Sequence, residues 1–164
     1  MDIRKLARLA LLTAVARIIF VIELQIPNPF PIPGVKLGLA NIITVYAVYR
    51  YRPGEAAMVL ASRILLGSFF SGRAIALLYS AAGGTACLLG MLLLKRVIPP
   101  RWLWISSVLG AVFHNIGQIA VAVAVIGISA LAYLPFLLVS GWLAGAFTGL
   151  CAQLVMQKGR FWRL

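Results

Sequence analysis

Polar side chains are scarce in the apolar runs of this chain, and three of them cluster within Phe113–Gln118 as His114, Asn115 and Gln118. His114 and Gln118 are four residues apart, so on a helix they share one face. Asn115 lies about 100° round from His114 on such a helix. Intramembrane polar groups tend to mark function, although they also fix bundles through hydrogen bonds between helices. The spacing therefore predicts a polar patch that either lines a cavity or joins helices.

Two arginines, Arg17 and Arg63, also interrupt apolar runs. Arginine stays charged in proteins, so each needs a carboxylate, backbone carbonyls or water. Glu23 is the one acidic residue expected on the same side of the membrane, which leaves an excess of positive charge. Such a field suits a carboxylate or phosphate held by guanidinium contacts. The alternatives are that Arg17 reaches the outer membrane surface and that Arg63 forms a buried pair with Glu23.

Polar residues near the second apolar run complete a candidate site for a small, anionic organic molecule. The predicted substrate-binding residues are Glu23, Asn28, Lys36, Asn41, Arg63, His114, Asn115 and Gln118.

Signals for enzymatic chemistry are weak. The chain has one histidine and three acidic residues, which leaves little for acid–base catalysis. It has neither a glycine-rich phosphate loop with lysine nor an aspartate cluster that would hold magnesium on a diphosphate. Cys87 and Cys151 lie in apolar runs and are interpreted as small core residues. We therefore predict no catalytic site, no cofactor and no metal site.

Composition determines the elements that must position these residues. The chain is 63% hydrophobic and 11% charged, with a mean hydropathy of +1.03. A soluble domain has about 25% charged residues, and a spanning helix needs roughly 20 apolar ones. The sequence predicts an all-α integral membrane protein, a six-transmembrane-helix bundle that forms one membrane domain over residues 1–164. The predicted helices are residues 6–22, 36–49, 55–70, 74–94, 102–126 and 133–156.

Basic residues separate these segments in a pattern that indicates topology. If all six segments span, one side of the membrane holds most of them, and the positive-inside rule makes that side cytoplasmic. The N- and C-termini are then cytoplasmic, in the cell membrane. The net charge of +12 is thus assigned to topology and anionic membrane lipid, not to nucleic acid. The basic residues on this side are Arg4, Lys5, Arg8, Arg50, Arg52, Lys95, Arg96, Arg101, Lys158, Arg160 and Arg163.

The segment Ile26–Gly34 has a proline at every second position from Pro27 to Pro33. This spacing forbids a helix and favours an extended path. Because the following apolar segment is too short for a full span, we expect this external loop to dip into the bundle and line a cavity. The alternative is a stiff loop on the outer surface.

Small residues recur at helical spacing in two places. Ala10 and Ala14 are four apart in the first segment, and Gly141, Gly145 and Gly149 are four apart in the last. Such stripes allow close helix contact in lipid, either within the chain or with a second protein.

The stretch from Glu23 to Ile42, which contains P-N-P-F-P-I-P-G-V-K-L-G-L-A-N, with Thr44 and the later His114-Asn115 and Gln118, resembles the Gx transporter family, also labelled heptaprenyl diphosphate synthase component I. That family is similar to the substrate-binding S components of energy-coupling factor (ECF) transporters. The resemblance implies capture of a small molecule from outside, with a transmembrane scaffold subunit and cytoplasmic ATPase subunits as partners. It also implies that Ala10 and Ala14 dock the scaffold.

Two other functions compete with this interpretation. One is a membrane subunit of an isoprenoid- or quinone-handling enzyme, which binds lipid substrate while another chain catalyses the reaction. The other is an ion-coupled transporter or scaffold that acts alone, for which the lack of intramembrane acids is unfavourable.

Overall fold

The computed structural model describes residues 3–25, 39–71 and 74–158. The proline-rich loop, Asn28 and Lys36 lie outside the described residues, as do Arg160 and Arg163. The predictions made for them therefore stay predictions.

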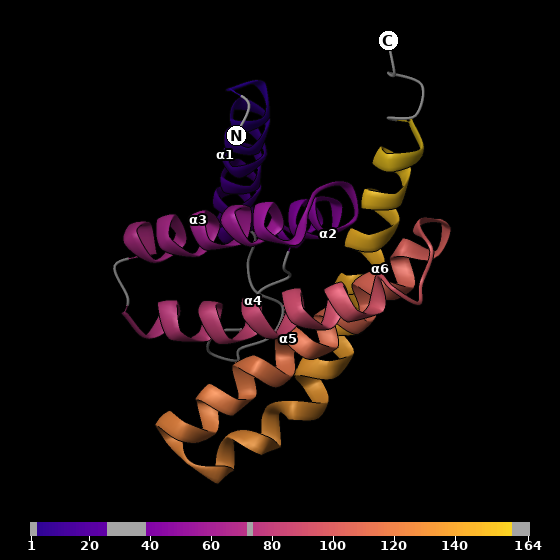
Figure 1. Ribbon diagram of the computed structural model, residues 1–164. Helices are drawn as coiled ribbons and strands as arrows, with labels where there is room; N and C mark the ends of the chain where they lie inside the picture. Colours follow the sequence, from indigo (N-terminus) through magenta and orange to yellow (C-terminus); the bar gives the residue numbers. More distant parts are fainter. Residues whose placement is uncertain (1–2, 26–38, 72–73, 159–164) are drawn as a thin grey trace.

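The described residues are almost entirely helical, which confirms the all-α prediction for this part of the chain (Figure 1). Each predicted apolar segment overlaps one helix. Two short 3-10 helices, η1 (Pro100–Trp102) and η2 (Ile128–Tyr133), precede the last two α-helices. The α-helices are α1 (Ile3–Gln25), α2 (Asn41–Arg50), α3 (Pro53–Ser71), α4 (Ala74–Leu94), α5 (Leu103–Ile126) and α6 (Leu134–Lys158).

Three described helical stretches are long and apolar enough to cross a membrane: Leu77–Leu94, Pro100–Ile126 and Ile128–Lys158. They contain most of α4 and all of α5 and α6. The 10 residues of α2 rise only about 15 Å, against roughly 30 Å of hydrocarbon. The six-span bundle is therefore supported in part, by three helices, and the count for α1, α2 and α3 stays a prediction.

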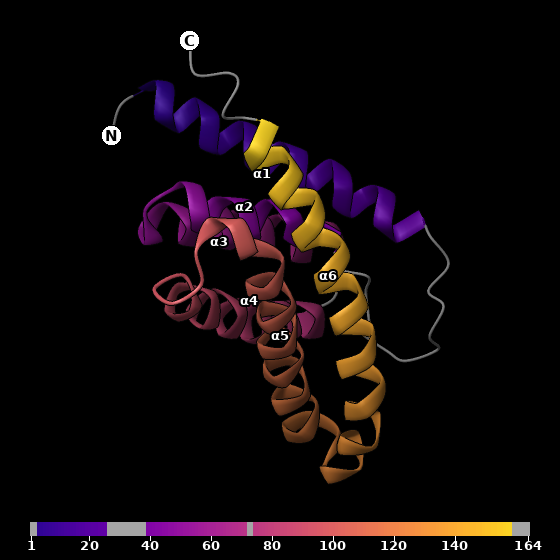
Figure 2. The same ribbon diagram turned by 90° about the vertical axis from the view of Figure 1, so that its right-hand side faces the viewer.

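The helices α4, α5 and α6 pack closely because glycines remove side chains at their crossings. A Cβ atom added at Gly117 of α5 would lie 2.5 Å from the carbonyl oxygen of Ala82 in α4. One added at Gly145 of α6 would lie 2.8 Å from the Cα of Val108 in α5. Figures 1 and 2 show α5 and α6 running side by side in opposite directions. Backbone approach of this kind is the usual way that helices associate in lipid.

The helices α1, α2 and α3 form the other part of the molecule (Figure 2). The helix α1 packs on α3 and α2, and its buried residues include Leu9 and Ala16. The main core joins α2, α3, α4, α5 and α6, and its buried members include Val48, Leu60 and Met91. A smaller core holds α5, η2 and α6 together where the chain turns from α5 into α6.

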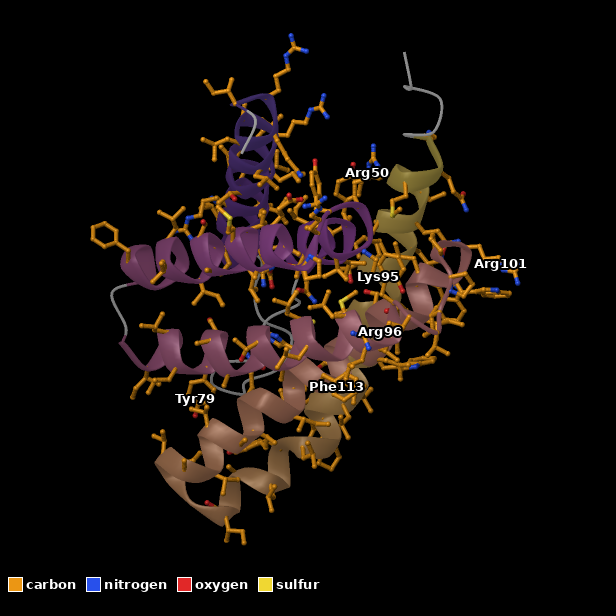
Figure 3. All side chains as sticks on the ribbon, in the orientation of Figure 1. Arg50, Tyr79, Lys95, Arg96, Arg101 and Phe113 are labelled. Atoms are coloured by element: carbon orange, nitrogen blue, oxygen red, sulfur yellow. The ribbon has the colours of Figure 1, made fainter. Side chains whose placement is uncertain are left out.

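Helix ends that carry basic residues meet at one end of the molecule. Arg50, Lys95, Arg96 and Arg101 lie at this basic end in Figure 3. Lys95 Nζ donates to the Val48 carbonyl oxygen at 2.6 Å, which joins the ends of α4 and α2. The six-span topology requires such grouping of these helix ends.

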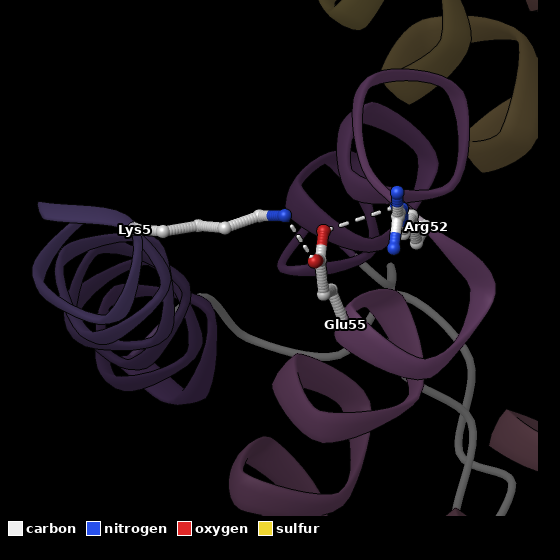
Figure 4. Close-up of polar contacts among 3 residues, drawn as sticks. All are labelled: Lys5, Arg52 and Glu55. Atoms are coloured by element: carbon white, nitrogen blue, oxygen red, sulfur yellow. Dashed lines mark hydrogen bonds and ion pairs between the residues drawn. The ribbon is translucent and has the colours of Figure 1, made fainter. Parts of the chain in front are cut away.

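Lys5 and Glu55 join α1 to α3 at the basic end (Figure 4). Their side chains form an ion pair with an N···O distance of 2.5 Å. Glu55 also accepts a hydrogen bond from the Arg52 backbone N–H at 3.1 Å. The hydrogen bond from Lys5, and then that from Arg52, lowers the pKa of the Glu55 carboxyl from its ordinary value.

Candidate ligand-binding site

Arg63, in the middle of α3, has polar neighbours on three other helices. Its guanidinium interacts electrostatically with Glu23 of α1 and Cys87 of α4, and with His114 of α5. No salt bridge of 4 Å or less joins Arg63 to another described residue.

Glu23 and Asn41 approach this region from the helix ends opposite the basic end. Glu23, near the end of α1, is 6% exposed. Asn41 begins α2, and its Nδ2 donates to the Cys87 sulfur at 3.8 Å. A carboxylate and an amide therefore approach the polar cluster from this end.

Cys87 was predicted to be a small core residue, and it is 1% exposed. The structure adds that its thiol contacts Asn41 and interacts with Arg63, so it also belongs to the polar cluster. In the sequence, the one sign that Cys87 faces the polar cluster is that it follows Gly83 by four residues, because residues four apart share a helix face.

His114 and Gln118 lie together against Gly83 of α4. A Cβ atom at Gly83 would lie 2.9 Å from Gln118 Cγ and 2.9 Å from His114 Cε1. The missing side chain of Gly83 therefore makes the space that both residues fill. His114 Nδ1 is buried beside the Gly83 backbone, and it makes no hydrogen bond of full geometry with a described residue.

Asn115 turns away from this cluster and toward α6. Its Nδ2 donates a hydrogen bond to the backbone carbonyl of Leu137. It also lies in the space left by Gly141, where a Cβ atom would collide with Asn115 Nδ2. The polar patch predicted on α5 is thus divided, with His114 and Gln118 on the α4 side and Asn115 in the α5–α6 interface. The interhelical alternative describes the geometry of Asn115.

Arg17, on α1, lies against α3. Its Cζ is 4.9 Å from the centre of the Phe20 ring, a distance that allows a cation–π interaction. A Cβ atom at Gly67 of α3 would lie 3.6 Å from one terminal nitrogen of Arg17. The side chain therefore follows the α1–α3 contact.

The two stripes of small residues have different surroundings. Gly141, Gly145 and Gly149 are buried, and all three face α5 side chains or backbone. This stripe therefore has its partner within the chain. Ala10 and Ala14 are exposed on α1, so the structure leaves that stripe open to lipid or a second protein.

The sequence-predicted residues that converge are Glu23, Asn41, Arg63, His114 and Gln118. They come from α1, α2, α3 and α5, and α4 supplies Gly83 and Cys87. Among the described residues, no group of three or more His, Cys, Asp or Glu side chains could hold a metal ion. With a guanidinium, a carboxylate, an imidazole and two amides, the cluster can bind a small polar anion by charge and hydrogen bonds.

Comparison with known proteins supplies the family. No curated protein and no solved structure matches the chain. Residues 12–155 match the model of the family described as heptaprenyl diphosphate synthase component I. The match covers all of the residues that converge around Arg63 and most of the described helices. The chain is therefore a member of the heptaprenyl diphosphate synthase component I family.

Proposed function

We propose that this chain is the substrate-binding membrane subunit of an uptake transporter of the energy-coupling factor type. It captures a small organic anion from outside the cell, and ATPase subunits on other chains power transport.

The observation that carries the proposal is the convergence on Arg63. Five helices contribute to one cluster, although its members are spread from Glu23 to Gln118 in the sequence. A partly buried arginine in the middle of a helix, without a close ion pair among the described residues, is costly in a membrane, so such a residue is by default a functional one. A ligand carboxylate or phosphate would supply the missing partner.

The direction of capture follows from the charge distribution. Glu23 and Asn41 lie at helix ends opposite the basic end, and Arg63 and His114 lie halfway along their helices. If the basic end is cytoplasmic, as the positive-inside rule predicts, the cluster extends from the middle of the membrane toward the outside. Both termini are then cytoplasmic.

Removal of the Arg63 charge tests ligand capture. In Arg63→Met, the anion that co-purifies with the wild-type protein in native mass spectrometry should be lost. Its re-binding should weaken by at least about 30-fold, since removing one member of a buried charge pair costs about 2–5 kcal/mol. Arg96→Met, at the exposed basic end, is the matched control and should keep the ligand. Equal ligand occupancy in both variants would exclude Arg63 from the site.

Partner docking is tested on the exposed face of α1. Ala10→Trp should break co-purification with a transmembrane scaffold and its ATPases while ligand binding persists, because a bulky ring prevents close helix approach. Loss of both properties together would mean that the stripe serves only folding. Uptake that continues without any ATPase subunit would contradict the energy-coupled mechanism.

The family description favours a second candidate, a membrane subunit that binds an isoprenoid diphosphate for a catalytic partner. A diphosphate is also an anion, so Arg63 would serve either function. Co-purification with a soluble prenyltransferase, in place of ATPases, would favour this candidate.

A further inference from the structure

The turn between α4 and α5 joins two stretches that are long and apolar enough to cross a membrane. The first of these stretches ends at Leu94, and the second begins at Pro100. If both cross a bilayer, the few residues between them lie at its surface, where the lipid headgroups are. The position of this turn therefore follows from two neighbouring spans and does not depend on how α1, α2 and α3 meet the membrane.

Hydrogen bonds hold the backbone of this turn in place. The Ile98 N–H donates to the Leu94 carbonyl oxygen at 2.7 Å. The Trp102 N–H donates to the Pro99 carbonyl oxygen at 2.9 Å. From α2, the Tyr49 hydroxyl group donates to the Ile98 carbonyl oxygen at 3.4 Å. Side chains that leave the turn therefore start from fixed positions, which lowers the entropy cost of binding through them.

The outer face of the turn combines basic and apolar side chains. Lys95 points inward, toward the Val48 carbonyl oxygen of α2. Arg96 and Arg101 are exposed, and Figure 3 shows Arg101 pointing away from the molecule. Trp102 is also exposed, at 46%. An exposed tryptophan at the end of a span is typical of the level of the headgroups, and arginine suits their phosphates.

Arg96 and Arg101 have no carboxylate partner among the described residues. Neither forms a salt bridge of 4 Å or less with a described residue. The sequence has no aspartate or glutamate after Glu55. Glu55 itself forms an ion pair with Lys5 at 2.5 Å, and Glu23 lies at the helix ends opposite the basic end. The charge of the turn therefore suits an anion that comes from outside the chain.

We propose that the α4–α5 turn binds an anionic glycerophospholipid. Arg96 and Arg101 pair with the headgroup phosphate, and Trp102 packs against the glycerol and the start of the acyl chains. The excess of basic residues in the sequence predicts only a general attraction to anionic lipid, whereas the structure assigns a site. An acidic protein surface would also match the arginines, but it would need the turn to stand clear of the bilayer, and Arg96 follows the end of a span by two residues. The inference does not depend on the ligand of Arg63.

The lipid preference of the full chain can be measured by native mass spectrometry. Protein in detergent is mixed with equal amounts of phosphatidylglycerol and phosphatidylcholine that have the same acyl chains, and the bound lipids are compared. The wild-type protein should retain phosphatidylglycerol in preference. The double variant Arg96→Gln/Arg101→Gln should lower the ratio of the two bound lipids about 25-fold, since one basic residue at an anionic surface changes binding about fivefold.

Two further variants separate a local site from total charge. Arg8→Gln/Arg52→Gln is the matched control, because it removes the same charge from exposed positions on α1 and before α3. It should leave the ratio within about twofold, since exposed charges away from the bound headgroup are screened. Trp102→Ala should reduce retention of both lipids alike and keep the ratio, because the glycerol and the acyl chains are common to both.

Four outcomes would overturn the proposal. Equal losses in the two double variants would mean that total charge sets the preference. Equal retention of both lipids by the wild-type protein would remove the selectivity for anionic lipid. Displacement of phosphatidylglycerol by an equal concentration of glycerol 3-phosphate would indicate a site for free phosphate. If Arg96→Gln/Arg101→Gln lost an acidic partner protein and kept its lipid, the turn would be a protein-docking surface.

Discussion

The α5–α6 interface and the junction around Arg63 handle polar residues in opposite ways. In the interface, glycines bring the backbones together and polar groups bond to one another: Asn115 donates to the Leu137 carbonyl, and the hydroxyl oxygens of Ser107 and Thr148 are 3.3 Å apart. Around Arg63, a cation and an imidazole interact over longer distances, and His114 Nδ1 makes no hydrogen bond of full geometry with a described residue. Completed hydrogen bonds hold helices together, whereas we propose that the junction around Arg63 is the place where a ligand binds.

The largest expected effect on stability is at the glycine contact nearest the basic end. In Gly149→Leu, the new Cβ would lie 2.7 Å from the Cα of Trp104. Because backbone cannot move aside as a side chain can, we expect a loss near the upper end of about 1–3 kcal/mol. Unfolding in mixed detergent measures it. Gly54→Ala, where no atom lies within 4 Å, should change little, and equal losses would contradict the interface assignment.

The same kind of substitution should act differently at Gly83. In Gly83→Ala, His114 and Gln118 must shift, since the added atom would lie 2.9 Å from each side chain. Ligand affinity should fall by about tenfold with a smaller change in stability than in Gly149→Leu. Gly84→Ala is the control, because its added atom would meet the flexible ends of Ile64 and Leu60. Unchanged affinity in Gly83→Ala would remove the His114 face from the site.

A pair of substitutions on α5 sharpens the comparison one residue at a time. Asn115→Leu should lower the free energy of unfolding by about 1 kcal/mol, the size of an interhelical hydrogen bond in a membrane, with ligand binding kept in the folded fraction. Gln118→Leu should weaken ligand binding with little change in stability. Calorimetry measures the ligand affinity of both variants, and unfolding in detergent measures their stability. A reversed pattern would show that the two faces have been assigned the wrong roles.

The smallest effect is expected at the basic end. Because Lys5 lowers the pKa of Glu55, the ionised carboxylate stabilises the fold above the pKa that it has in the unfolded chain. That contribution is lost as pH falls through the lower pKa of the folded state. In Lys5→Met, the decrease in unfolding free energy between neutral and acidic pH should therefore be smaller. Exposed ion pairs contribute little, so an identical pH profile in the variant would mean that this pair contributes nothing measurable.

The sequence by itself determined where the helices run and which helix ends lie together. The apolar segment predicted at residues 74–94 is α4, Ala74–Leu94, because a run of apolar residues bounded by charges has few alternatives. Grouping of the basic helix ends followed from the same runs, and Arg50, Lys95, Arg96 and Arg101 meet at one end as expected (Figure 3). Arg63 and His114 were found because a polar residue in an apolar run is conspicuous.

Only the tertiary structure decided which face each polar residue uses. His114 and Asn115 are adjacent in sequence, yet one lies against Gly83 of α4 and the other against Gly141 of α6. The contact of Cys87 with Asn41 likewise came from the structure, since its spacing from Gly83 indicates only a shared helix face. The physical reason is that helix periodicity fixes only relative directions along one helix. The space and the hydrogen-bond partners at each face come from glycines and carbonyls on other helices, far away in the chain.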